Sequence, residues 1–171
     1  MIIELHRLGQ WSRLCKLVLV IVPRIITEQE VRYYVPSDYE PQAVYIQLGV
    51  QAAQGLFTVE EATVTEVASV RADLDSITAQ GLHPGETEAL AVLRRSPEYV
   101  FCTGDELAAE ALTYLEIPNQ GVSLEGLLRC MSLSVKGLRG HFTEECYRSW
   151  VRKASIAHVQ GLGSVKDLIK H

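Results

Sequence analysis

The hydrophobic positions of the first sixteen residues recur every three residues, which predicts a helix. These positions are Ile2, Leu5, Leu8, Trp11 and Leu14. Gly9 predicts that the helix is kinked or interrupted there, because glycine is a poor helix former. The apolar run LVLVIV at 17–22 follows and is ended by Pro23, which predicts a buried strand. The run is far shorter than the roughly 20 residues that span a bilayer, so we expect no membrane association.

The pattern changes repeatedly between 27 and 75. Thr27 is a favoured N-cap residue, and Glu28 and Glu30 follow in the first turn of the helix it predicts, where the helix dipole favours carboxylates. The run AVYIQLGV at 43–50 fits a strand or a helix, and its periodicity does not decide between them. The stretch 57–75 is β-branched at first and more helical later, so it predicts a strand that leads into a helix.

The second half of the chain has clearer periodicity. The stretch 76–85 predicts a loop that ends in a His-Pro-Gly turn. The next run, 86–95, predicts a helix, because it is acidic at its start and basic at its end. The short apolar run at 98–103 predicts a strand. The periodic run at 106–117 predicts an amphipathic helix. Two further helices are expected at 123–131 and 143–154.

Buried apolar strands that alternate with helices predict an α/β fold, with a mostly parallel sheet covered by helices on both faces. Ligands of such sheets bind at the carboxyl ends of the strands. Asp105 follows the strand expected at 98–103, so it is placed at that edge. The helix that begins with Glu86 and Glu88 is expected nearby.

Composition limits the functional classes. The 171 residues fit one domain, and 47% hydrophobic with 22% charged residues is a globular composition. The net charge of −5 argues against a non-specific nucleic-acid binder covered in Lys and Arg. It does not exclude an acidic pocket that meets phosphates through divalent cations. The four cysteines are far apart and form no C-x-x-C motif, which predicts reduced thiols and a cytoplasmic location.

The candidate chemistry is acidic. The sequence has no nucleophile elbow, Walker loop, G-x-G-x-x-G or H-E-x-x-H motif. It has carboxylates near predicted helix starts: Glu28, Glu30, Glu86, Glu88 and Asp105. Carboxylates suit Mg²⁺ or Mn²⁺, and converging ones support phosphodiester hydrolysis. Acids at helix starts are also common for capping alone, so both interpretations stay open for each residue.

Three short motifs occur in a characteristic order. GLHPGETEALAVL is followed by FCTGDELAAEAL and then by GVSLEGLL. The segment upstream predicts a helix, a strand that ends in proline and a second helix with acidic residues. Its sequence is IIELHRLGQWSRLCKLVLVIVPRIITEQEV. Together these segments resemble PIN-domain proteins, in particular the prokaryotic branch with a Gly-Glu-x-Glu-Ala helix and a Thr-x-Asp turn. The resemblance covers roughly 2–128.

The resemblance implies a three-layer α/β/α fold with a central, mostly parallel sheet. It implies a PIN-like domain at 1–130, which leaves a C-terminal helical extension at 131–171. Many PIN domains are Mg²⁺- or Mn²⁺-dependent ribonucleases, and prokaryotic members are often toxins paired with an antitoxin. The partners to expect are therefore RNA, in particular single-stranded RNA, an antitoxin protein, or a second copy in a homodimer.

The resemblance also assigns site residues. Asp105 matches the acid after the late strand, and Thr103 the small hydroxyl residue beside it. Glu86 or Glu88 matches the acid at the start of the preceding helix. Two residues that are two apart lie about 200° around a helix, so only one of them is expected to point into the site.

The resemblance also assigns to the site one acid of the second helix, Glu30 or else Glu28. The sequence departs from the family pattern at its N-terminal end. The family pattern opens with a strand that ends in Asp-x-Ser or Asp-x-Asn, and no aspartate precedes Glu4. The domain is thus expected to be truncated at its N-terminus. The enzyme prediction depends on that aspartate being present in the full-length protein. The alternative is a degenerate, non-catalytic PIN-like interaction protein.

Overall fold

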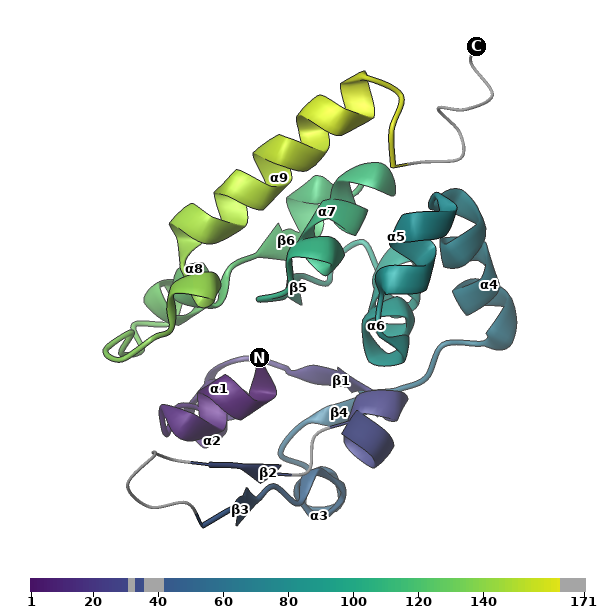
Figure 1. The fold of residues 1–171 in the computed structure, drawn as a ribbon. Helices are drawn as coiled ribbons and strands as arrows, with labels where there is room; N and C mark the ends of the chain where they lie inside the picture. Colours follow the sequence, from purple (N-terminus) through teal and green to yellow (C-terminus); the bar gives the residue numbers. More distant parts are fainter. Residues whose placement is uncertain (31–32, 36–41, 164–171) are drawn as a thin grey trace.

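The computed structural model describes residues 1–30, 33–35 and 42–163, with the side chain of Glu30 also outside the description. The chain folds into many helices and a few short strands, which confirms the α/β prediction (Figure 1). The strands of the described residues form three two-stranded sheets. The pairs β1–β4 and β5–β6 are parallel, and the pair β2–β3 is antiparallel.

The N-terminal elements lie together in the lower part of Figure 1. They are α1 (Ile2–Arg7), α2 (Trp11–Leu17), β1 (Ile21–Pro23), the π-helix η1 (Ile26–Glu30), β2 (Tyr33–Tyr34), β3 (Val44–Tyr45), α3 (Leu48–Ala53) and β4 (Thr58–Glu60).

The later elements lie above them, with the N-terminus of the chain between the two groups (Figure 1). They are α4 (Val64–Asp73), α5 (Ser76–Gly81), α6 (Pro84–Arg95), β5 (Phe101–Cys102), α7 (Glu106–Tyr114), the 3₁₀ helix η2 (Pro118–Gln120), β6 (Gly121–Val122), α8 (Leu124–Cys130), the 3₁₀ helix η3 (Gly140–Phe142) and α9 (Glu144–Val159).

Several sequence predictions are confirmed. The first helix is interrupted at Gly9, whose φ of +64° is a left-handed conformation that suits glycine. The segment 43–50 divides into a strand, β3, and the start of a helix, α3. The stretch 57–75 is a strand followed by a helix, as expected, and Thr63 caps that helix with its hydroxyl.

Three predictions were wrong in detail. The loop expected at 76–85 contains α5, because the carboxylate of Asp75 accepts hydrogen bonds from two N–H groups of the first turn and so caps a short helix. The strand expected at 17–22 begins only at Ile21, because Leu17 still belongs to α2. Thr27 is not an N-cap: its hydroxyl donates to the carbonyl of Pro23 at 3.2 Å.

The apolar core has two parts. One lies between α4, α6, α7 and α9, where Leu90, Leu112 and Ala154 are fully buried. The other lies between α1, α2, β1, α3 and α8, around Leu5 and Leu124. Helix α9 therefore packs in the same part of the core as α7. The domain boundary expected at residue 130 stays a prediction. In the described ranges, no helix has both the length and the apolar character needed to cross a membrane.

Candidate functional site

A cavity of about 470 Å³ lies between the two parallel strand pairs. Its walls come from β1 and the residues before it (18–23) and from β5 and the turn after it, with α1, α2 and α6 closing the sides. The lining is mostly apolar and belongs to both parts of the core. The volume is about three times that of the ~150 Å³ apolar cavity that suffices for benzene. We call this space the interstrand slot.

Two carboxylates belong to the lining of the interstrand slot, those of Glu86 and Asp105. Asp105 follows β5, and Glu86 lies in the first turn of α6. Both carboxylates act electrostatically on the buried nitrogen of Met1, which also lines the slot, and we call this region of the slot the acidic mouth.

Asp105 is the N-cap of α7. Its Oδ1 accepts a hydrogen bond from the N–H of Ala108 at 3.0 Å. Its own N–H donates to Oγ1 of Thr103 at 3.1 Å, and Thr103 is buried. The Thr-Gly-Asp turn is thus held by local hydrogen bonds, which fix Asp105 at the mouth. Asp105 therefore serves as a helix cap and as a wall of the slot at the same time.

Glu86 also has a local role. It is the third residue of α6, and its Oε2 accepts a hydrogen bond from the N–H of His83 at 3.0 Å, as in a capping box. The side chain is only partly buried. Glu86 also lines the interstrand slot, and its charge acts on the nitrogen of Met1.

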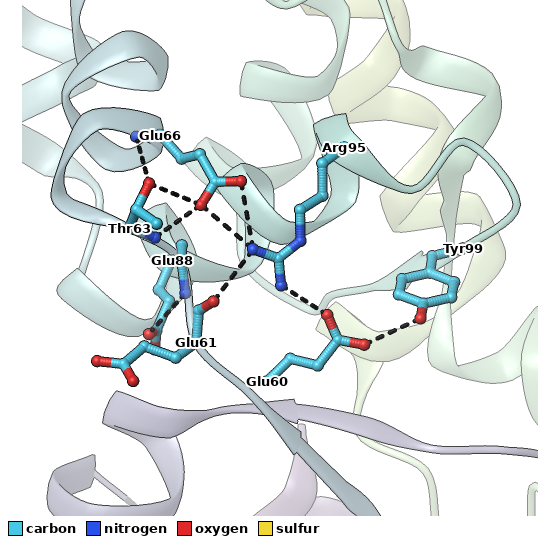
Figure 2. A network of polar contacts seen from close by, with 8 residues as sticks. Glu60, Glu61, Thr63, Glu66, Glu88, Arg95 and Tyr99 are labelled. Atoms are coloured by element: carbon cyan, nitrogen blue, oxygen red, sulfur yellow. Dashed lines mark hydrogen bonds and ion pairs between the residues drawn. The ribbon is translucent and has the colours of Figure 1, made fainter.

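Glu88 points elsewhere. Its side chain is 3% exposed, and its two oxygens accept hydrogen bonds from the backbone N–H groups of Ile25, at 2.8 Å, and Ala62, at 3.4 Å. Figure 2 shows it beneath Thr63 and Glu66. These two N–H groups follow β1 and β4, so the carboxylate ties the ends of both strands to α6. Glu88 does not line the slot.

The surroundings of Glu88 form a network of ion pairs that joins α6 to β4 (Figure 2). Arg95 donates to the carboxylates of Glu60, at 2.8 Å, and Glu66, at 3.2 Å. It also donates to the carbonyl of Glu61 at 3.1 Å, and the hydroxyl of Tyr99 donates to Glu60 at 2.9 Å. Because its charges are paired with one another, this network has a structural role.

The acids of the second helix lie apart from the acidic mouth. Glu28 is exposed and pairs with Arg24 at 2.8 Å. It lines a separate hollow of about 610 Å³ with Arg24 and Glu61, which are themselves paired at 2.6 Å. Glu30 ends η1, but its side chain lies outside the described part of the chain. The structure therefore does not bring Glu28 together with Asp105, and the position of the Glu30 carboxylate stays a prediction.

The nitrogen of Met1 lies beside the carboxylates of the acidic mouth. It is buried although Met1 as a whole is 38% exposed. Burial lowers its pKa, while the negative forms of Cys102, Glu4, Glu86 and Asp105 oppose this shift. The Met1 nitrogen therefore lies close enough to Glu86 and Asp105 for their charges to act on it, while its burial disfavours the charged form.

Two further wall residues come from the C-terminal part of the chain. His141 and Phe142 line the slot, and the Phe142 ring lies against Gly104. A Cβ added to Gly104 would come within 2.2 Å of that ring. Nothing in the local sequence around Phe142 indicates this contact, because it depends on how η3 packs on the turn after β5.

The described residues do not form a complete metal site. Within residues 1–30, 33–35 and 42–163, no group of three or more His, Cys, Asp or Glu side chains is placed to hold a metal ion. Glu88 is engaged by backbone N–H groups, which leaves Asp105 and Glu86 as the carboxylates among the predicted ligands that line the interstrand slot. Mg²⁺ and Mn²⁺ take more oxygen ligands than these two residues supply.

Comparison with known proteins gave no relative. The chain matches no protein-family model, and neither the curated proteins nor the solved structures include a similar protein.

Proposed function

We propose that this protein is a PIN-type, divalent-metal-dependent ribonuclease to which the chain contributes Asp105 and Glu86. One observation supports the proposal: these two carboxylates, from the turn after β5 and the start of α6, line the same cavity and both act on the charge of the Met1 nitrogen. Thr103 supports them by accepting the N–H of Asp105. Together with the resemblance of the sequence motifs to PIN domains, this favours a site for Mg²⁺ or Mn²⁺. Further ligands are needed to complete it.

The finer fold assignment belongs to the same proposal. The two parallel strand pairs, with helices packed around them, are compatible with parts of a three-layer α/β/α arrangement around one central sheet. In that arrangement β1 and β5 would stand on either side of the slot. The finer assignment thus predicts that the two pairs belong to one sheet.

The proposed substrate is single-stranded RNA, because a concave acidic site suits a flexible strand better than a rigid duplex. A toxin role with an antitoxin partner, a homodimer and a cytoplasmic location are parts of the same proposal, and they rest on the resemblance alone.

A second candidate is a non-catalytic PIN-like interaction protein. The bonding of Glu88 favours it, since this residue is held by two backbone N–H groups rather than directed to the acidic mouth. The absence of a three-ligand cluster within the described ranges favours it too.

Cleavage of a fluorescently labelled single-stranded RNA, with Mn²⁺ or with EDTA, separates the two candidates. The nuclease proposal expects the full-length protein to cleave this RNA only with Mn²⁺, and it expects Asp105→Asn in the full-length protein to abolish the cleavage. Glu98→Gln is the matched control, because Glu98 is exposed in the turn before β5. Loss of a helix cap costs only about 1 kcal/mol, so Asp105→Asn should remain folded in a melting experiment. Cleavage by Asp105→Asn at the wild-type rate would exclude the proposed site, and no cleavage by the full-length wild-type protein would favour the interaction protein.

A further inference from the structure

The connection between α8 and α9, residues 131–143, is tied to α1. The N–H of Arg139 donates to Oε1 of the buried Glu4 at 3.2 Å. The side chain of Arg7 donates to the carbonyl of Gly137 at 2.5 Å. Because α1 is also one of the elements that line the interstrand slot, these bonds hold the connection next to the slot.

The end of this connection reaches the turn after β5. The ring of Phe142 lies where a Cβ of Gly104 would be, at 2.2 Å from that position. Gly104 directly precedes Asp105, and His141 directly precedes Phe142. The rings of His141 and Phe142 have centroids 4.0 Å apart, and His141 lines the same cavity as Asp105. The contact between Phe142 and Gly104 therefore joins the two chain segments that carry His141 and Asp105.

The charges of the slot make His141 distinctive. The carboxylates of the acidic mouth, Glu86 and Asp105, repel a phosphodiester, which is negative. A divalent cation would offset part of this repulsion, and phosphate oxygens also favour hydrogen bonds from N–H donors. Among the described residues that line the slot, none is a lysine or an arginine. His141 is the residue of this lining whose side chain can carry a positive charge.

Two other aromatic residues of the lining carry hydrogen-bond donors, and both donors are already used. Nε1 of Trp11 donates to Oε1 of Gln51 at 2.8 Å. The hydroxyl of Tyr99 donates to Glu60 at 2.9 Å. The ring of His141 is exposed and makes no hydrogen bond to another residue of the described ranges. An imidazole has an N–H donor in its neutral form as well as in its charged form, so this donor is available in either state.

We propose that His141 is a phosphate-contacting residue, whose ring N–H donates to a non-bridging oxygen of the phosphodiester of single-stranded RNA at the acidic mouth. This inference rests on the proposed ribonuclease function. It extends the site to the segment 131–143, which the resemblance to PIN domains at 2–128 does not cover. The connection between α8 and α9 then supplies a part of the substrate site as well as a link to α9.

NMR of the full-length wild-type protein with ¹³C-labelled histidine tests the contact directly. The probe is a six-nucleotide single-stranded RNA, added with Ca²⁺ in place of Mn²⁺ so that binding is followed separately from cleavage. We expect the ring signal of His141, identified by its absence in His141→Ala, to shift as the RNA is added. The signal of His158 should not move, because His158 lies on α9 and does not line the slot. A His141 signal that stays in place while RNA binds would overturn the proposal.

Variants measure how much the contact contributes. His141→Ala should weaken binding of the labelled RNA, followed by fluorescence anisotropy, about three- to tenfold, as the loss of one hydrogen bond implies. Its Tm should change little, since the side chain is exposed. His141→Gln keeps an N–H donor and should recover part of the affinity. Lys136→Ala is the matched control, because Lys136 is an exposed basic residue of the same connection that does not line the slot. Its affinity should stay within about twofold of the wild type.

The outcomes separate this inference from the proposed nuclease. RNA binding that needs His141, without cleavage in Mn²⁺, would support the contact and refute the nuclease. Cleavage that is lost in Asp105→Asn while His141→Ala binds RNA like the wild type would do the reverse. An RNA that does not bind to the full-length protein at all would overturn the proposed contact too.

Discussion

Glu88, buried in α6, accepts a hydrogen bond from the backbone N–H of Ile25 at 2.8 Å and so ties the helix to the turn after β1. Its other oxygen accepts the N–H of Ala62, directly after β4. One side chain therefore holds the carboxyl ends of two neighbouring strands. The sequence pattern predicted a metal ligand at position 88 or 86, whereas these contacts give Glu88 a structural role that can be measured.

Glu88→Ala should lower the free energy of unfolding by about 2–3 kcal/mol, because it leaves two backbone N–H groups without their acceptor. The Tm should fall by roughly 4–10 °C in a chain of this size. Urea unfolding and a thermal melt measure the change. Glu98→Ala, at an exposed position, is the control and should change the stability by less than about 0.5 kcal/mol. A stable Glu88→Ala protein would contradict the structural role.

Gly104→Ala should destabilise the protein because the new methyl group would meet the ring of Phe142 at 2.2 Å. Overpacking of this kind typically costs about 1–3 kcal/mol. The matched background is Phe142→Ala, in which the ring is absent. There the added cost of Gly104→Ala should nearly vanish, as a double-mutant cycle by urea unfolding would show. An unchanged cost in both backgrounds would place the strain elsewhere.

Glu4 should make the stability depend on acid pH. Burial raises the pKa of Glu4, but hydrogen bonds from Arg7 and from the N–H of Arg139 lower it by more, so the net shift is downward from 4.5. A lowered pKa in the folded state means that the ionised form stabilises the fold above pH 4.5. This stabilisation is lost as the pH falls through the folded-state pKa.

Glu4→Gln isolates this effect. At pH 6 the wild-type chain should be more stable than the variant by about 1.5–3 kcal/mol, because the variant removes the charged acceptor of the hydrogen bonds from Arg7 and Arg139. The difference should shrink steadily below pH 4.5. Urea midpoints measured between pH 3 and pH 6 check this prediction, and a difference that does not depend on pH would contradict it.

The four thiols should differ in reactivity. Burial raises the pKa of Cys102 to about 12 and that of Cys15 to about 11, so their thiolate forms are rare near pH 8. Cys130 is exposed. Iodoacetamide at pH 8 should therefore modify Cys130 first, and Cys102 and Cys15 only when urea unfolds the chain, as peptide mass spectrometry would show. Cys130→Ser is the control and should remove the fast reaction.

Local features of the fold could be predicted from the sequence where they depend on contacts between residues close together in the chain. Asp105 was expected as a helix cap or a metal ligand, and the structure places it as the cap of α7 on the wall of the slot. The interruption at Gly9 was also predictable, because a left-handed backbone favours glycine. The short helix after Asp75 was missed, since a cap residue and one turn give little periodicity.

The sequence by itself indicated the helix starts at Asp105 and Thr143, because a cap needs only a side chain and an N–H two or three residues away. Only the tertiary structure decided that Glu88 turns to Ile25 while Glu86 faces the acidic mouth. The bonds and packing that fix these directions come from residues far away in the chain. Only the tertiary structure decided where the interstrand slot lies, because the sequence of a single strand does not determine which strand pairs with it.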